Sequence, residues 1–340
     1  MARIALDAMG GDFAPQATVA GALLALAELD PAHSIQLVGR TAVLEGQLQS
    51  LLAGELSALA IHRDRLSIVE APDVIEMTDK PSAVVRGKPL SSMAVGLRLQ
   101  AEGKSDAFVS AGSTGAQMAT SMVLLRLHAG LKRPAIATFF PTRGKTIVVL
   151  DSGANVDCSP EELVQFARLG ATYAQCVMGR PNPAVGLLSI GEEPEKGNAV
   201  TKETHLLLKQ SGLNFIGNVE GRDLPAGGTD HHALDVVVCD GFVGNVLLKF
   251  FEAIAPLMIE TLRKAGVDGE QLESGLKHLD YSEHGGAPLL GVRGVSMIAH
   301  GKSSPRAIKN ALKAAAQAVT SGMNELIGQR LSAAATETAA

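Results

Sequence analysis

The sequence predicts an α/β protein with three layers, α/β/α, in which helices cover both faces of a largely parallel sheet. Two observations lead to this fold class. Short aliphatic runs alternate with longer helical patterns along the 340 residues, and the runs are apolar throughout. Strands covered on both faces have this pattern, which is typical of parallel sheets between helix layers. The 46% of hydrophobic residues, with 36 glycines and 3% aromatics, fit an aliphatic core with many tight turns.

The predicted elements follow one another in βαβ order. The predicted strands are 4–7, 35–39, 66–70, 107–110, 146–151, 185–190, 215–218, 236–240 and 296–300. The predicted helices are 15–29, 91–101, 115–127, 160–178, 200–210, 244–263 and 304–331. The clearest helix start is S-P-E-E at 159–162, because a serine cap, a first-turn proline and two carboxylates all favour a helix N-terminus. Because no repeat or linker divides the chain, we expect one large domain over 1–331, with a helical hairpin at 244–284 and a disordered tail at 332–340.

Charge and cysteine usage narrow the class of protein. The formal net charge is −5 and no Lys/Arg run reaches four residues, so the sequence does not favour a nucleic-acid partner. Cys158, Cys176 and Cys239 are odd in number and lack C-x-x-C spacing, which argues against a disulfide framework or a zinc site. No secretory segment and no stretch of 18 apolar residues is found. We therefore expect a cytoplasmic protein, with peripheral contact at the inner face of the membrane left open.

Glycine and small polar residues follow seven of the predicted strands. These exits read L-D-A-M-G-G-D, V-S-A-G-S-T-G-A, V-L-D-S-G-A-N, L-S-I-G-E-E-P-E-K-G-N, I-G-N-V-E-G, V-C-D-G-F-V-G-N and I-A-H-G-K-S-S. In a parallel sheet the carboxyl ends of the strands share one edge, where helix N-termini present free N–H groups. For a single exit, a turn that needs glycine explains the pattern as well. Seven similar exits favour loops that line one ligand crevice.

The exit S-A-G-S-T-G-A at 110–116 joins a strand to a helix through a turn of small residues. Gly112 and Gly115 let the backbone approach a ligand, and Ser113 and Thr114 add hydroxyl donors, so the turn suits phosphate or another oxyanion. It has neither the G-K-[ST] ending of a Walker motif nor the G-x-G-x-x-G of an NAD site. An ordinary helix N-cap is the alternative.

Three further exits carry candidate polar groups. Lys196, in E-E-P-E-K-G-N, would act as a point charge on phosphate or on a developing oxyanion, unless the segment is a solvated charged loop. Asn245, in D-G-F-V-G-N, falls in the first turn of a helix, where its amide can donate to an oxygen. Asn155 ends the similar D-S-G-A-N, and a local Asx turn is the alternative for both asparagines.

Three other features are weaker candidates. The run Asp230-His231-His232, with Asp235, is interpreted as a polar turn and not as a metal site, because it follows a glycine pair and precedes a strand. Cys239, in V-V-V-C, is interpreted as a buried small hydrophobe and not as a nucleophile. We therefore predict no metal. His300 suits a ligand contact and a structural role equally.

The exits, in their order along the chain, resemble the PlsX phosphate acyltransferase family. The matching motifs are D-A-M-G-G-D at 7–12, S-A-G-S-T-G-A at 110–116, D-S-G-A-N at 151–155, K-G-N at 196–198, D-G-F-V-G-N at 240–245, G-G-A-P-L-L-G-V at 285–292 and A-H-G-K-S at 299–303. The resemblance covers residues 1 to about 327, and this many spaced motifs is far more specific than one glycine loop.

The resemblance implies an activity and a fold. The family converts acyl-acyl carrier protein and inorganic phosphate to acyl phosphate for bacterial phospholipid synthesis, without a cofactor. Its members are homodimers with a Rossmann-like fold similar to isocitrate and isopropylmalate dehydrogenases and to phosphotransacetylase. Further partners that it implies are the acylated carrier protein and a downstream glycerol-3-phosphate acyltransferase. Phosphate is itself the nucleophile, which agrees with the lack of a Ser/His/Asp or Cys/His set in the sequence.

The resemblance also implies site residues by motif position. Lys196 and Asn245 carry over as catalytic. The substrate- and phosphate-binding residues are Asp7, Gly10, Gly11, Gly112, Ser113, Thr114, Gly115, Asn155, Asn198, Asp240, Gly244 and His300. Asp7 and Asp12 are expected to fix their loop by accepting hydrogen bonds, because a carboxylate beside phosphate would repel it.

One segment departs from the family. In the family the segment after the Asn245 helix can be long, apolar and basic, with a tip that contacts membrane, whereas 252–281 here is compact and of mixed charge. A helical hairpin at a dimer contact is therefore favoured. Arg86, Lys88, Lys132 and Arg133 are candidates for the landing site of an acidic carrier, with an ordinary solvated surface as the alternative.

Two rival functions stay open at this stage. One is an NAD-dependent dehydrogenase of the same fold, for which the sequence lacks a dinucleotide fingerprint and a metal-binding carboxylate set. The other is a non-catalytic protein that binds an acyl carrier or a phosphoryl ligand. Neither acyl-chain length nor the way the carrier docks can be predicted from the sequence.

Overall fold

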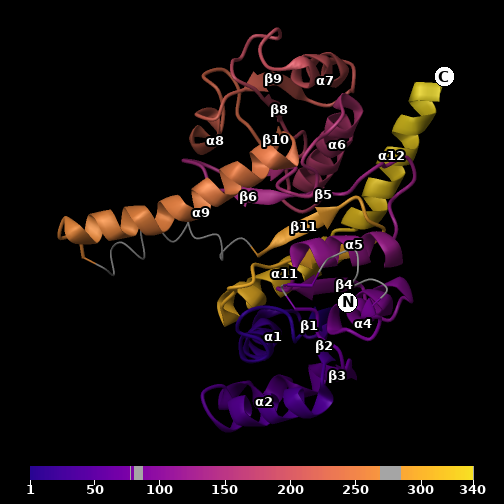
Figure 1. Cartoon of the computed structure of the whole chain (residues 1–340), viewed down its shortest axis with the longest axis vertical. Helices are drawn as coiled ribbons and strands as arrows, with labels where there is room; N and C mark the ends of the chain where they lie inside the picture. Colours follow the sequence, from indigo (N-terminus) through magenta and orange to yellow (C-terminus); the bar gives the residue numbers. More distant parts are fainter. Residues whose placement is uncertain (77, 80–86, 269–284, 340) are drawn as a thin grey trace. The chain divides into compact units, whose positions relative to one another are not determined.

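The computed structural model describes residues 1–76, 78–79, 87–268 and 285–339 (Figure 1). The chain divides into two compact units. Unit 1 comprises Met1–His128 and His284–Glu325, and unit 2 comprises Ala129–Glu283 and Leu326–Ala340. The predicted α/β class is confirmed, but the described strands form two sheets where the sequence suggested one. The strands of both sheets are similarly short and apolar in the sequence. The hydrophobic pattern therefore could not predict which strands pair with one another.

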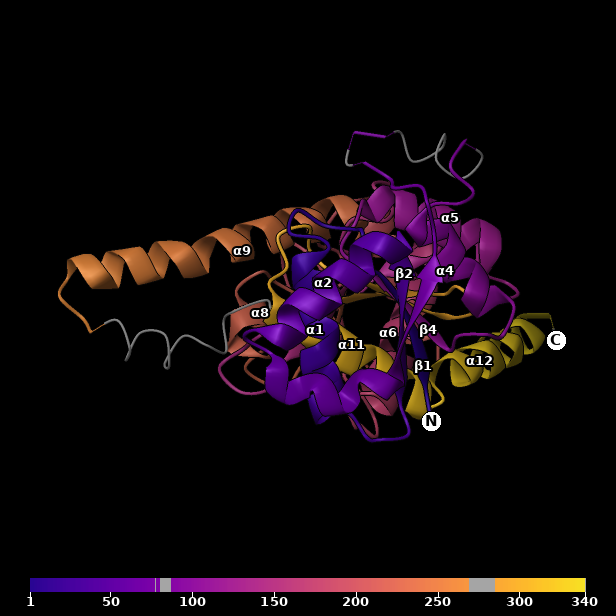
Figure 2. The same ribbon diagram turned by 90° about the horizontal axis from the view of Figure 1, so that it is seen from below.

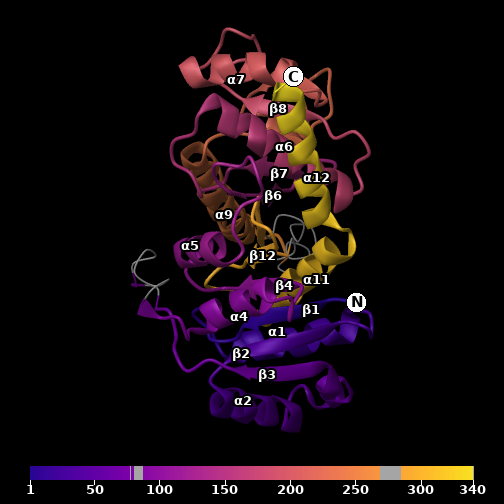
Figure 3. The ribbon, with the colours of Figure 1, turned by 90° about the vertical axis from the view of Figure 1, so that its right-hand side faces the viewer.

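The strands of unit 1 belong to one sheet and run parallel, with one exception. Its strands are β1 (Arg3–Asp7), β2 (Ser34–Gly39), β3 (Leu66–Glu70), β4 (Ala107–Ser110), β11 (Ala287–Leu290) and β12 (Val295–Ile298). They lie in the order β3-β2-β1-β4-β12-β11, and β11 alone among these runs antiparallel to its neighbour (Figure 3). The chain leaves β1 toward β2 on one side and later returns to β4 on the other. The carboxyl ends of β1 and β4 therefore form the topological switch point, where ligands of such sheets bind.

Helices cover both faces of this sheet. They are α1 (Gln16–Glu28), α2 (Thr41–Ala53), the 3₁₀ helix η1 (Ser57–Arg65), α4 (Ser92–Ala101), α5 (Thr114–Leu124) and α11 (Pro305–Thr320). Figure 2 shows the strands between a layer of α1, α2 and α11 and a layer of α4 and α5. Helix α1 packs closely on α11, because Gly21 leaves room where a Cβ would lie 2.6 Å from the Cβ of Ile308.

Unit 2 has a smaller sheet of the same kind. Its strands are β6 (Thr138–Phe140), β7 (Ile147–Leu150), β8 (Val185–Leu188), β9 (Phe215–Val219) and β10 (Val236–Val238), in the order β6-β7-β10-β8-β9. The short β5 (Ala135–Ile136) precedes them in the chain and is not part of this sheet. All pairs are parallel except β6 with β7. The helices are α6 (Pro160–Cys176), α7 (Ala199–Lys209), α8 (Asp223–Ala226) and α9 (Gly241–Lys264).

Successive residues of β7 serve the two faces of the unit 2 sheet. Ile147 and Val149 belong to a cluster on which Leu247 and Phe251 of α9 pack. On α6, a Cβ on Gly170 would lie 2.7 Å from the Leu150 side chain, so this glycine allows the helix to approach the other face. Both faces are thus covered, as the continuous apolar runs predicted.

The structure differs from the sequence prediction at several elements. The predicted helix 304–331 is interrupted at Ser321 and Gly322. Gly322 has a φ of +66°, so α11 ends there before α12 (Met323–Ala339) begins. Helix α12 continues through residues expected to be disordered. The sequence prediction also omitted α2, η1, α8, β5, β6 and β11, all of which are short, weakly patterned or at an edge.

Helix α9 is long and largely exposed. Figure 1 shows it as a single long helix. Its 24 residues include a window with a mean hydropathy of 1.7, of which 6% is buried. By length and composition alone it could cross a membrane, contrary to the expectation that no segment could, although a core helix or a signal sequence passes the same test. The helix carries an ion pair between Lys249 and Glu252 at 2.8 Å. Most of the second arm of the expected hairpin, 269–284, lies outside the described residues.

Candidate active site

Asp7, the last residue of β1, ties two loops of unit 1 together. It is buried, with 2% exposed, and its Oδ2 accepts a hydrogen bond of 2.7 Å from Ser110 Oγ at the end of β4. Its Oδ1 accepts one of 3.2 Å from Met9 N, and Ser110 Oγ in turn accepts one of 3.0 Å from Gly112 N. The carboxylate thus fixes the two exit loops at the switch point, as the sequence predicted for the loop after β1.

Burial raises the pKa of the Asp7 carboxyl above its ordinary value, because desolvation disfavours the charged form. Hydrogen bonds from Ser92, Ser110, Met9 and Gly10 oppose this rise in pKa. A carboxylate surrounded in this way contributes to the loop architecture and offers little to an anionic ligand.

Gly10 and Gly11 are required because neighbouring atoms and the backbone conformation leave no place for a side chain. A Cβ on Gly10 would lie 2.5 Å from Asp7 Oδ2 and 3.0 Å from Gly112 N. Gly11 has a φ of +108°, a conformation that side chains rarely adopt, and packs on the carbonyl oxygen of Gly301. Asp12 N donates to the same oxygen at 2.7 Å. The loops after β1, β4 and β12 therefore meet.

The loop after β4 leads into α5 as an ordinary capped turn with exposed residues. Ser113 is the N-cap and accepts a hydrogen bond of 3.4 Å from Ala116 N. Thr114 is exposed. Because it is the first residue of the helix, its N–H lies at the positive end of the helix dipole. His300, after β12, is exposed, and its Nδ1 accepts a hydrogen bond of 3.1 Å from Lys302 N. This end of unit 1 offers N–H groups suited to a phosphate oxygen.

Unit 2 contains a second buried carboxylate that, like Asp7, follows a strand and accepts hydrogen bonds from the backbone. Asp151 follows β7, is buried, and accepts hydrogen bonds from the backbone N–H groups of Ile136, Ala154 and Asn155. Burial raises its pKa, and these hydrogen bonds oppose the rise. Asn155 is also buried and donates from Nδ2 to Asp151 Oδ2 at 2.9 Å and to Pro134 O at 2.8 Å. The Asn155 amide is thus engaged inside the fold and holds the loop.

The motif D-G-F-V-G-N packs α9 onto this loop. Asp240 is the N-cap and accepts a hydrogen bond of 2.8 Å from Val243 N. A Cβ on Gly241 would lie 2.5 Å from Asn155 O, and one on Gly244 would overlap Asp151 O, so both glycines are required by the contact. Asn245 is exposed and lies beside Gly153. The structure therefore gives Asp240 a capping role and leaves the Asn245 amide accessible.

The motif K-G-N forms the start of α7. Lys196 is exposed, and its stem lies over Gly191, where a Cβ would meet Lys196 Cγ at 2.7 Å. Within the described part of the chain its ammonium has no carboxylate within 4 Å. Gly197 has a φ of +96°, and Asn198 caps the helix by accepting a hydrogen bond of 2.8 Å from Thr201 N. The Lys196 ammonium, unpaired among the described residues, thus lies just before the N-terminus of α7, and this arrangement is suited to binding an anion.

Beside these two motifs, unit 2 has a pocket of about 770 Å³, which we call the exit pocket. It is lined by Val156, Asp157, Cys158, Leu163, Leu187, Leu188, Ser189, Ile190, Gly197, Asn198, Val200, Thr201, Gly221, Cys239, Asp240, Val243 and Leu247. The lining is largely apolar. It comes from the carboxyl ends of β8 and β10, from the loop after β7, and from the starts of α6, α7 and α9. Its size and character are those of ligand sites at the edge of a parallel sheet.

The two cysteines of the exit pocket are poor nucleophiles. Burial raises the pKa of Cys158 to about 12 and that of Cys239 well above its ordinary value, with nearby carboxylates adding to both shifts. Both thiols therefore stay protonated near neutral pH. The interpretation of Cys239 as a buried small hydrophobe, and not as a nucleophile, agrees with this.

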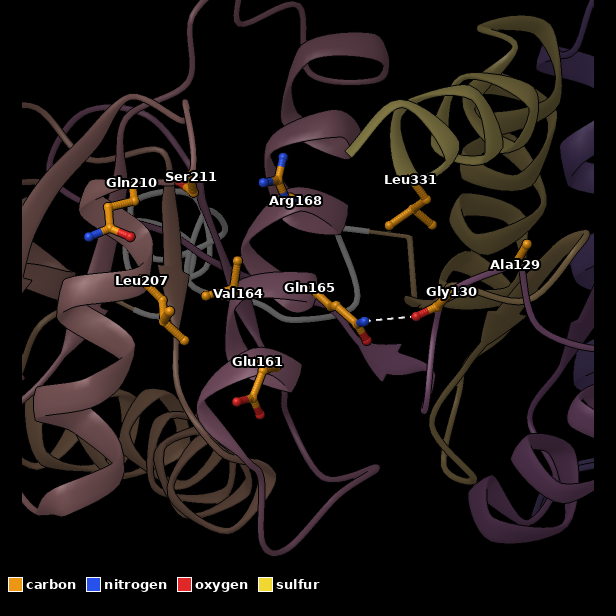
Figure 4. A pocket seen from close by; sticks show the side chains of 10 residues that line it. All are labelled: Ala129, Gly130, Glu161, Val164, Gln165, Arg168, Leu207, Gln210, Ser211 and Leu331. Atoms are coloured by element: carbon orange, nitrogen blue, oxygen red, sulfur yellow. Dashed lines mark hydrogen bonds between the residues drawn. The ribbon is translucent and has the colours of Figure 1, made fainter. Parts of the chain in front are cut away.

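A second pocket of unit 2, of about 400 Å³, lies on α6 (Figure 4). Figure 4 shows Arg168, Val164 and Gln165 on one helix and the hydrogen bond of 2.8 Å from Gln165 Nε2 to Gly130 O. None of the predicted site residues lines this pocket. It is also not at the carboxyl edge of the sheet, so the exit pocket is the better candidate for the active site.

The structure brings the predicted site residues together in two groups, one in each unit. The group of unit 1 is Asp7, Gly10, Gly11, Gly112, Ser113, Thr114, Gly115 and His300, and the group of unit 2 is Asn155, Lys196, Asn198, Asp240, Gly244 and Asn245. Sequence reasoning missed Ser92, Ser110 and Ser189. A serine at a strand end before Ala-Gly was the available signal for Ser110, whereas the pocket leucines carry no local signal.

Local contacts explain several of the weaker candidates from the sequence. The N–H groups of His231 and His232 donate to Thr229 Oγ1, which makes this segment a polar turn. Among the described residues, no group of three or more His, Cys, Asp and Glu could hold a metal ion. Of the candidate carrier contacts, Lys88 pairs with Asp79 at 2.5 Å. Arg133 pairs with Glu162 at 3.3 Å and Lys132 lies in unit 2, while Arg86 lies outside the described residues.

Comparisons with known proteins show which family and which folds the chain resembles. A family model described as fatty acid synthesis protein matches residues 2–326. A protein of Desulforamulus reducens named phosphate acyltransferase is 47% identical over 97% of this chain and 98% of its own length. A phosphotransacetylase from Streptococcus pyogenes matches with a TM-score of 0.64 at 16% identity, over 94% of each chain. A 4-hydroxythreonine-4-phosphate dehydrogenase from Burkholderia phymatum matches with a TM-score of 0.52 at 15% identity, over 93% of this chain and 98% of its own.

The two solved structures show the fold alone, and they confirm the predicted dehydrogenase-like and phosphotransacetylase-like α/β class. The sequence matches go further, because they extend over almost the whole chain at high identity. The chain therefore belongs to the fatty acid synthesis protein family, and it is an acyltransferase, as are its relatives of 44–47% identity that are named phosphate acyltransferase.

Proposed function

We propose that this acyltransferase takes its acyl group from an acylated acyl carrier protein and passes it to inorganic phosphate, releasing acyl phosphate for phospholipid synthesis. One observation carries the proposal. The exit pocket is largely aliphatic, and the K-G-N and D-G-F-V-G-N motifs form part of its wall. An apolar pocket beside a free cation and two helix N-termini suits an acyl group that reacts with an anion.

The proposed reaction needs no residue to become acylated. A phosphate oxygen attacks the thioester carbonyl carbon, the carbonyl electrons move onto its oxygen, and a tetrahedral oxyanion forms. The oxyanion collapses, the C–S bond breaks, and the thiolate leaves with the electron pair and takes the proton that hydrogenphosphate brought. A thiol of pKa about 8.5 is a fair leaving group, so a strong general acid is not needed. Positioning and charge stabilisation are the main tasks.

The proposed roles follow from what each side chain can offer. The ammonium of Lys196 supplies a point charge for phosphate, and the amide of Asn245 donates to phosphate or to the carbonyl oxygen. Gly10, Gly11 and Gly244 contribute by allowing the close packing of the loops.

The proposal includes a homodimer in the cytoplasm. Helix α9 supports it, because Phe242, Val246, Phe250 and Leu257 form an exposed apolar stripe that a second copy would cover. The same stripe would serve peripheral contact with the inner face of the membrane. Acyl phosphate would then pass to a glycerol-3-phosphate acyltransferase.

The experiment that tests the proposed function detects the product directly. The protein is mixed with decanoyl-acyl carrier protein and phosphate, and acyl phosphate is trapped with hydroxylamine as the hydroxamate. Formation of hydroxamate that needs both phosphate and protein supports the proposal. Hydroxamate only from a coenzyme A thioester would assign a different donor, and carrier binding without hydroxamate would favour a non-catalytic binding protein. A nicotinamide absorbance change with hydroxy acids would revive the dehydrogenase alternative.

A further inference from the structure

Ser189, the first residue after β8, carries a buried hydroxyl whose hydrogen-bonding capacity is not used. Its Oγ has no hydrogen-bond partner among the described residues. Buried side-chain oxygens without a partner are rare, because each loses its hydration without compensation. The other orphaned atoms of the described chain belong to Gln100, Gln117, Thr138 and Arg180, none of which lines either pocket. Ser189 does line the exit pocket.

The backbone around Ser189 is held in place. Ser189 N donates to Val219 O at 2.9 Å, which continues the β8–β9 pairing by one residue. The following loop is fastened by Asn218, whose Nδ2 donates to Glu193 O at 2.8 Å and whose Oδ1 contacts His205 Nδ1 at 2.9 Å. Both Asn218 and His205 are buried. The backbone that carries the hydroxyl is therefore held in place beside the exit pocket.

The charges of the exit pocket indicate which part of the substrate lies there. Its lining includes the carboxylates Asp157 and Asp240 and no Lys or Arg. Phosphate would be repelled by this lining, whereas a neutral acyl chain with its thioester carbonyl would not. The K-G-N glycine forms the wall beside the orphaned hydroxyl, since a Cβ on Gly197 would lie 3.0 Å from Ser189 Oγ.

We infer that the exit pocket holds the acyl chain and that the Ser189 hydroxyl donates a hydrogen bond to the thioester carbonyl oxygen. This inference rests on the proposed function. The carbonyl oxygen supplies the acceptor that Ser189 lacks in the empty pocket, and it gains charge as phosphate attacks. Ser189 therefore stabilises the oxyanion, while Lys196 acts on phosphate.

The test uses the Ser189→Ala variant, with Thr138→Val as the matched control. Thr138 Oγ1 is also buried without a partner, but Thr138 lies in β6 and lines neither pocket. In both variants the loss of an orphaned hydroxyl should leave the melting temperature unchanged or higher. With decanoyl-acyl carrier protein, Ser189→Ala should lower kcat/KM on the order of 10- to 100-fold and leave the KM for phosphate unchanged. Thr138→Val should match the wild type.

Unchanged kcat/KM in Ser189→Ala, an equal loss in Thr138→Val, or a loss accompanied by a lower melting temperature would each overturn the inference. A binding measurement separates this result from a failure of the proposed function. Calorimetry with S-decanoylpantetheine should show binding to the wild type that is weakened about tenfold in Ser189→Ala. If the wild type binds this thioester but forms no acyl phosphate, only the proposed function fails; equal binding by wild type and variant overturns the inference.

Discussion

Replacing Gly10 by alanine should destabilise unit 1 through one crowded contact. The added Cβ would lie 2.5 Å from Asp7 Oδ2 and 3.0 Å from Gly112 N. Asp7 cannot simply move aside, because the same Oδ2 accepts the 2.7 Å hydrogen bond from Ser110. Relief therefore requires either a shift of the backbone or the loss of a hydrogen bond to a buried carboxylate.

The size of the effect follows from these two costs. Overpacking costs about 1–3 kcal/mol, and a hydrogen bond to a charged group is worth about 1.5–3 kcal/mol. Alanine recovers about 0.4–1 kcal/mol by restricting the unfolded chain. Because only one of these two costs applies, we expect a net loss of about 1–2 kcal/mol in the free energy of unfolding, which lowers the melting temperature by roughly 2–8 °C for a unit of this size.

Thermal and urea unfolding of Gly10→Ala, beside the control Gly46→Ala, measure this effect. Gly46 lies in α2 of the same unit, and a Cβ there meets no atom within 4 Å. The control should gain about 0.5–1 kcal/mol, because alanine favours a helix. If Gly10→Ala is as stable as the wild type, the network that joins the loops after β1 and β4 is not rigid and this account of the glycine pair is wrong.

Two further variants test other contacts. Lys309 and Lys313 hydrogen-bond to Glu28 and lower its pKa from 4.5 to about 2. Since this folded-state pKa is depressed, the stabilisation is present above about pH 4.5 and is lost as the pH falls toward 2. Because 42% of the Glu28 side chain is exposed, we expect Glu28→Gln to lose only about 1 kcal/mol at pH 7, with a difference from wild type in urea unfolding that vanishes at low pH and shrinks in high salt. Asn198→Ala should lose about 1 kcal/mol of stability by removing the cap of α7, and an unchanged melting temperature would contradict the capping role.

The sequence was a good guide to strands and caps because both depend on local chemistry. The runs at β3 and β4 have the predicted bounds, and Ser159 forms the expected capping box with Glu162. Strand β11 was missed, because Pro288 and the glycines on either side of the strand contradict the usual strand pattern. Partition into two sheets depends on pairing between distant residues, which no local pattern encodes.

The candidate site was predictable only in part, for the same reason. Motif spacing located Lys196, Asn198 and Asp240 at the carboxyl edge of a sheet, because loops that follow parallel strands meet there. The aliphatic wall of the exit pocket combines Leu163 of α6 with Leu247 of α9, far apart in the sequence. These leucines are indistinguishable from core residues until the fold places them beside the motifs.

Acyl phosphate formation by Lys196→Ala, compared with Lys202→Ala, tests most directly whether Lys196 acts on phosphate in the proposed reaction. Lys202 is an exposed lysine of α7 in the same unit that lines neither pocket, so it controls for the loss of one positive charge near the motif. Hydroxamate trapped from decanoyl-acyl carrier protein and phosphate should fall on the order of 100-fold for Lys196→Ala and stay at the wild-type rate for Lys202→Ala, with both variants folded. Near-normal turnover by Lys196→Ala would contradict the account.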